Sequence, residues 1–122
     1  MSNALKNTFL IHAVVGVGFG ALLLALPGQF LGWFGWQPVD PILSRVLGAA
    51  LLALAWSSYR GFRAKERAQV STLIEVEAVF TVLGALGVLR HLLIAYYPWY
   101  VWLLFAVLAL FAMAWLYFQF KK

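Results

Sequence analysis

The sequence predicts an all-α fold, a single bundle of four antiparallel transmembrane helices. Composition is the first observation: 65% of the 122 residues are hydrophobic and only 11% are charged, against roughly 45–50% and about 25% in soluble domains. The second is that four apolar segments approach the roughly 20-residue length that crosses a bilayer. The third is that basic residues gather outside these segments. We therefore expect one integral membrane domain over residues 1–122.

The first predicted span covers about residues 8–26 and ends at Pro27. A cleaved signal peptide is the alternative, because Lys6 precedes the apolar run. The run is long for a signal peptide and no small-x-small cleavage site follows it, so we expect the helix to be retained. Gly16 and Gly20 form a GxxxG pattern, which lets a neighbouring helix approach closely.

Residues 28–41 form an aromatic connection that we expect to lie in the membrane interface, as a loop or a short helix. Trp33, Phe34 and Trp36 alternate here with glycine, and tryptophan prefers the headgroup region. A lid over a binding site is the alternative. The second predicted span follows over about residues 42–59, and its small residues suit close helix packing.

The connection over residues 60–68 is the most charged part of the chain. Its basic residues are Arg60, Arg63, Lys65 and Arg67. Basic segments stay on the cytoplasmic side of a membrane, and both ends of the chain also carry lysine. We therefore expect this loop and both termini to face the cytoplasm in a prokaryotic inner membrane. The net charge of +5 then indicates topology and attraction to lipid, not nucleic-acid binding.

The third predicted span, about residues 71–97, is unusual because it is apolar and yet contains Glu75, Glu77, Arg90 and His91. A charged group at the bilayer centre costs on the order of 2.5–3.5 kcal/mol, so such groups face inward and are paired. Glu75 and Glu77 lie about 200° apart around a helix. Glu77 shares its face with Thr81 and Gly84, so we expect this face to pack inside the bundle.

Two polar groups are predicted to meet inside the cytoplasmic leaflet. A rise of about 1.5 Å per residue places His12 of the first span and Glu77 of the third span at similar depth, both on faces of small residues. A hydrogen bond between them would satisfy two buried polar groups. The pair is either a proton or cation site or a polar contact that fixes helix register.

A second cluster is predicted near the outer leaflet. Arg45, Arg90 and His91 all fall near it by depth, and Asp40 is the acidic residue close by. Excess cationic donors at an interface can hold a phosphate or a carboxylate. The alternative is that the arginines reach lipid headgroups or bond to loop carbonyls.

Haem between the two histidines is excluded by depth, since helical rise separates His12 from His91 by on the order of 20 Å. A haem or chlorin on one histidine stays open. The absence of cysteine excludes disulfides and thiolate ligands. No catalytic, nucleotide-binding or metal-binding spacing is present, so we predict no catalytic residue, metal or cofactor.

The segment Ser44–Trp56, SRVLGAALLALAW, carries a resemblance to known proteins. With its Arg45 before Leu47–Leu52, the turn from Pro27 to Pro41 and the basic loop, the chain resembles small four-helix bacterial and archaeal membrane proteins of unknown function, loosely DoxX-like. The resemblance implies the four-helix fold. DoxX is associated with a quinone-linked thiosulfate oxidoreductase, which makes a quinone-linked redox subunit one alternative, although no set of catalytic residues matches.

The fourth predicted span, about residues 99–118, has aromatic side chains and no charge. With the aromatic connection, it favours a non-enzymatic role: an accessory or structural subunit that packs against other membrane chains, or a self-associating unit. A protein that binds or transports a small molecule, lipid or anion through Arg45, Arg90 and His91 is the alternative.

The predicted topology is testable because the chain lacks cysteine. Ser2→Cys and Ala64→Cys should be protected from an impermeant thiol reagent in intact cells, whereas Gln37→Cys should be labelled, since basic segments stay inside. Labelling of Ala64→Cys from outside would contradict this topology.

Overall fold

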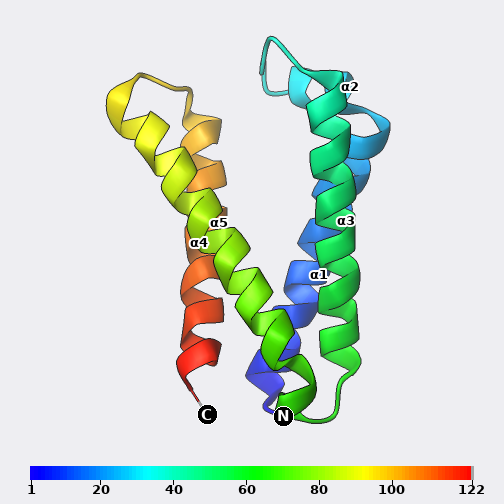
Figure 1. The fold of residues 1–122 in the computed structure, drawn as a ribbon. Helices are drawn as coiled ribbons and strands as arrows, with labels where there is room; N and C mark the ends of the chain where they lie inside the picture. The colour runs from blue at the N-terminus through cyan, green and yellow to red at the C-terminus, as the bar shows by residue number, and fades with distance from the viewer. Residues whose placement is uncertain (122) are drawn as a thin grey trace. The chain divides into compact units, whose positions relative to one another are not determined.

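The computed structural model describes residues 1–121 and is all-α, which confirms the predicted class. Figure 1 shows the elements in chain order. They are α1 (Asn3–Ala25), α2 (Pro27–Gly32), α3 (Pro41–Arg63), the 3₁₀-helix η1 (Arg67–Val70), α4 (Ser71–Ile94) and α5 (Trp99–Phe120). This described part of the chain contains four helical segments that are long and apolar enough to cross a membrane: α1, α3, the continuous pair of η1 and α4, and α5.

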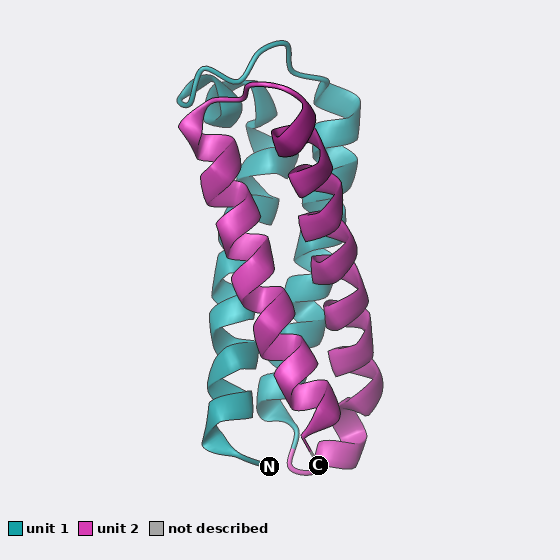
Figure 2. Ribbon diagram, turned by 90° about the vertical axis from the view of Figure 1, so that its left-hand side faces the viewer, with its two compact units in different colours: residues 1–64 teal, residues 65–122 magenta. Residues whose placement is uncertain are grey.

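The chain divides into two compact units, coloured separately in Figure 2. Unit 1 comprises residues 1–64 and contains the antiparallel pair α1 and α3, joined through α2. Unit 2 begins at Lys65 and contains η1 and the antiparallel pair α4 and α5. Each unit is therefore a helical hairpin, within which the two long helices are antiparallel as predicted.

Local sequence explains where the helices of unit 1 begin. The side chain of Ser2 accepts a hydrogen bond from the Leu5 amide, 3.2 Å away, and so caps α1. One carboxylate oxygen of Asp40 accepts from the amides of Ile42 and Leu43, each at 3.0 Å, and so caps α3. Such caps satisfy amides that have no partner inside the helix.

The helices α1 and α3 approach each other so closely that their backbones touch. A Cβ atom on Gly48 would lie 2.7 Å from the Gly20 carbonyl oxygen and 2.6 Å from the Leu24 nitrogen. One on Gly16 would lie 2.9 Å from the Ala55 Cβ. Gly16 and Gly20, expected from their spacing to pack against a helix, thus lie against α3.

The connection after α1 is organised by Phe30, which is buried. Its ring makes edge-on contacts with Phe19, Trp33 and Phe34, at centroid distances of 5.9, 5.9 and 5.7 Å. The helix α2 gives way to a turn in which Gly35 has φ +74°, a conformation that side chains disfavour. The predicted aromatic connection over residues 28–41 is therefore a short helix followed by an ordered turn.

In unit 2, α4 and α5 pack through side chains instead of backbone contact. A Cβ on Gly84 would lie 3.5 Å from the Leu108 side chain, an ordinary van der Waals distance. An alanine side chain would therefore fit at this position. Trp115 of α5 and Ile74 of α4 are both 0% exposed and lie in the core of the chain. Gly84, predicted as a packing residue, lies on the α4 surface that meets α5.

Helix ends differ from the predicted spans for local reasons. The helix α3 continues to Arg63, four residues past the predicted end of the span, so the predicted basic loop over residues 60–68 is largely helical. Basic side chains in a last turn interact favourably with the helix dipole. The helix α4 ends at Ile94, before the predicted residue 97, and its C-cap Ala95 is extended; Tyr97 itself is disfavoured in a helix because it precedes Pro98.

The backbone contact predicts a sharp difference between two glycines of unit 1. Gly48→Ala should destabilise the protein by about 1–3 kcal/mol, the usual cost of overpacking, because its Cβ meets backbone atoms. Gly18→Ala should be neutral or stabilising, because nothing lies within 4 Å of that position and alanine favours helices. Melting temperatures in detergent would measure both, and equal values would show that the contact is not tight.

Candidate functional site

The buried polar contact of unit 1 joins His12 of α1 to Ser58 of α3. The His12 Nδ1 and Ser58 Oγ atoms are 2.9 Å apart, and the two residues are 7% and 0% exposed. His12 lies one turn before Gly16, and Ser58 lies one turn after Ala55, so the close approach of the two helices brings them together. The contact satisfies two polar groups within an apolar pair of helices.

Sequence reasoning singled out His12 but not Ser58. Ser58 lies on the same face of α3 as Ala55 and Gly61, and all three are buried. A serine that interrupts a face of small residues is a signal that could have identified the partner, because that face is the one that packs closely against another helix. The hydroxyl can donate to the imidazole or accept from it, according to the tautomer.

Glu77 of α4 is also fully buried, at 0% exposed, whereas Glu75 is exposed. The structure therefore agrees with the predicted orientation of this helix. Thr81, one turn further on, is 1% exposed and donates to the backbone carbonyl of Glu77 at 2.8 Å. Near the end of α4 the buried residue is Leu92, whereas His91, which was expected on the same face as Glu77, is exposed. Glu77 belongs to unit 2 and His12 to unit 1, and their pairing stays a prediction.

Two arginines hold the C-terminal ends of helices. Arg45 Nη1 donates to the Leu24 carbonyl oxygen at 2.7 Å, near the end of α1. Arg67 Nη2 donates to the Phe118 carbonyl oxygen at 2.7 Å, near the end of α5. The last carbonyls of a helix have no partner within it, and a cation is favourable at that end. Each arginine thus stabilises a helix end of its own unit.

The role of Arg45 bears on the anion site predicted from Arg45, Arg90 and His91. The sequence predicted either an anion site or bonds from the arginines to headgroups or carbonyls. The structure shows a bond from Arg45 to the backbone carbonyl of Leu24. Arg90 and His91 lie in unit 2, both exposed, and the His91 ring meets the edge of Tyr97 at a centroid distance of 6.3 Å. The combination of the three residues in one anion site stays a prediction.

Residues 1–121 contain no group of three or more histidine, aspartate or glutamate side chains placed to hold a metal ion. His12 and His91 lie in different units. The binding of a pigment by one histidine stays an open hypothesis. The polar groups described above join one helix to another or donate to carbonyls at helix ends.

Comparison of the chain with known protein families, with curated proteins and with solved structures gave no match. The resemblance to DoxX-like proteins therefore depends on the residues of α3 and on the pattern of spans, and it stays an expectation.

The contact between His12 and Ser58 predicts energetic coupling. Ser58→Ala leaves the imidazole buried without its hydroxyl, at a cost of roughly 1–3 kcal/mol. His12→Leu with Ser58→Ala should then cost less than the two single changes added together. The measurement is a double-mutant cycle by thermal unfolding in detergent.

Ser2→Ala provides the control, since Ser2 caps α1 and lies about 15 Å along the helix from His12; at that separation it should be additive with His12→Leu. Additivity of Ser58→Ala as well would show that the contact contributes nothing. The same cycle with Glu77→Leu tests the pairing predicted from sequence.

Proposed function

We propose that this protein resides in a prokaryotic inner membrane, with both termini cytoplasmic, and serves as an accessory or structural subunit or as a self-associating unit. Four apolar helices and the concentration of basic residues around residues 60–68 support the membrane placement and its orientation. The DoxX-like resemblance is consistent with the same architecture.

The use of the polar side chains supports a structural role. Asp40 caps α3, Arg45 and Arg67 bond to the ends of α1 and α5, and Thr81 bonds to its own helix. Each of these groups satisfies backbone of the same unit. Polar side chains bonded in this way stabilise the helices of their own unit. Contacts with other chains would then be made by the apolar outer surface.

The observation that carries the proposal is the outward face of α5. Its members are all apolar or aromatic and exposed, and they recur at alternating intervals of three and four residues: Leu103, Ala106, Leu110, Met113, Tyr117 and Phe120. This spacing, sustained over six positions, is the pattern by which one helix packs along another at a shallow crossing angle. We name these six residues the α5 seam. The α5 helix is also the most apolar of the four spans and contains no Asp, Glu, Lys, Arg or His.

Cysteine cross-linking tests the proposal, because the chain has no cysteine of its own. Leu110→Cys, in the α5 seam, should form a disulfide-linked dimer in native membranes under mild oxidation if a second copy packs there. Leu83→Cys is the matched control: Leu83 on α4 is 63% exposed against 62% for Leu110, and its neighbour Gly84 contacts Leu108 at a similar depth. We expect no dimer from the control.

Native mass spectrometry of gently extracted protein separates the two forms of the proposal. A mass of two or more copies indicates self-association, and a mass that includes another chain indicates an accessory subunit. A monomeric mass together with equal cross-linking of both variants would contradict the proposal.

A further inference from the structure

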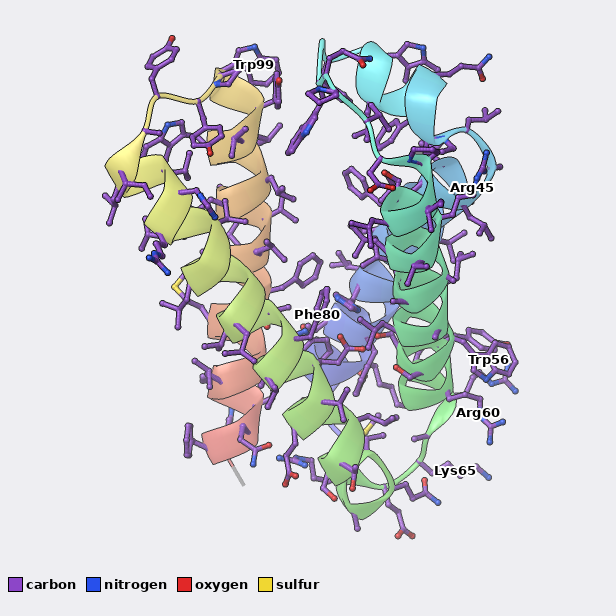
Figure 3. All side chains as sticks on the ribbon, turned by 45° about the horizontal axis from the view of Figure 1, so that its top comes forward. Arg45, Trp56, Arg60, Lys65, Phe80 and Trp99 are labelled. Carbon is purple, nitrogen blue, oxygen red and sulfur yellow. The ribbon has the colours of Figure 1, made fainter. Side chains whose placement is uncertain are left out.

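The last two turns of α3 have two different faces. Ala55, Ser58 and Gly61 are buried in unit 1. The other face carries four exposed residues within about 100° of arc: Trp56, Tyr59, Arg60 and Arg63. Figure 3 shows the labelled Trp56 and Arg60 side chains extending away from this end of the helix. We name these four residues the α3 patch.

The aromatic part of the α3 patch indicates its depth in a bilayer. Trp56 is 62% exposed and Tyr59 is 41% exposed, and their rings lie 5.8 Å apart between centroids at an interplanar angle of 36°. Tryptophan and tyrosine that face outward from a span concentrate at the headgroup level. Arg60 and Arg63 follow within the next turn, so they lie at the level of the phosphates in the proposed membrane.

The two arginines of the α3 patch differ from Arg45 and Arg67. The latter two donate to carbonyls at helix ends. Within residues 1–121, the side chains of Arg60 and Arg63 have neither a hydrogen bond nor an ion pair. Glu66, the nearest acidic residue in the sequence, engages its side chain in the capping box of η1. The guanidinium groups are thus exposed beside two aromatic rings and are not used by the fold.

We infer that the α3 patch binds the phosphate group of an anionic phospholipid. Guanidinium presents paired donors in a plane that match phosphate oxygens, and anionic leaflets attract basic side chains placed at their surface. Two guanidinium groups one turn apart can hold the headgroup while Trp56 and Tyr59 contact its glycerol and upper acyl region. This inference rests on the membrane insertion proposed above and adds a preferred class of lipid.

The test uses the full chain reconstituted in nanodiscs that contain equal amounts of phosphatidylglycerol and phosphatidylcholine. Native mass spectrometry then counts the lipids retained by the released protein. The wild type should retain phosphatidylglycerol in excess. Arg60→Gln with Arg63→Gln should lower that preference by about fivefold for each arginine removed, the attraction of one basic side chain to an anionic surface.

Lys6→Gln with Lys121→Gln is the control, since it removes the same charge outside the α3 patch and should lower the preference much less than the arginine variant does. A lipid preference that is unchanged in the arginine variant, or absent from the wild type, would overturn the inference while leaving the proposed function in place. Failure of the protein to insert into nanodiscs would overturn both. Loss of the preference on adding millimolar inorganic phosphate would identify a site for the free anion and overturn the assignment to lipid.

Discussion

The absence of a side chain at Gly20 and Gly48 is the constraint on which unit 1 depends. Between apolar helices in lipid, association comes from van der Waals packing and hydrogen bonds, not from the hydrophobic effect, so close backbone approach matters. A Cβ on Gly48 would meet Gly20 backbone at 2.7 Å. The same approach allows the Phe9 ring to cover Gly61, lets His12 reach Ser58 and brings the Arg45 side chain to α1. A wider separation of the two helices would break all three contacts together.

The ends of helices present a second problem, and both units solve it with arginine. An unpaired carbonyl in apolar surroundings is costly, and α1 and α5 each end with such groups. Arg45 and Arg67 reach these carbonyls from the beginning of another segment of the same unit. The arginines do not serve one purpose, however. Those that bond to helix ends are structural, whereas Arg60 and Arg63 are exposed and are available to a partner.

The composition of long segments predicted the helices. The local sequence did not predict where α3 ends or which groups bond to His12 and Arg45. Four apolar runs of spanning length predicted four helices. The spacing of Glu75 and Glu77 predicted that they lie on different faces, and Thr81 and Gly84 on the Glu77 face predicted that Glu77 is the buried one. The end of α3 was missed because hydropathy falls at Arg60 while the helix continues to Arg63. The Ser58 partner of His12 was missed because the register between two helices is a property of their packing, which neither segment specifies alone. For Arg45, bonding to a loop carbonyl was one predicted alternative, but no sequence signal identifies the helix carbonyl of Leu24 as the acceptor.

The contact between His12 and Ser58 has a consequence for how the chain is made. Ser58 lies 46 residues after His12, so at about 5–20 residues per second the ribosome adds it roughly 2–9 s later. Throughout that interval α1 carries a polar imidazole whose hydroxyl partner does not yet exist. In the proposed membrane, the imidazole gains this hydroxyl partner only as α3 arrives, so the hairpin of unit 1 is more favourable to insert than α1 alone. Under the proposed membrane placement, the insertion of α1 is thus coupled to the synthesis of α3.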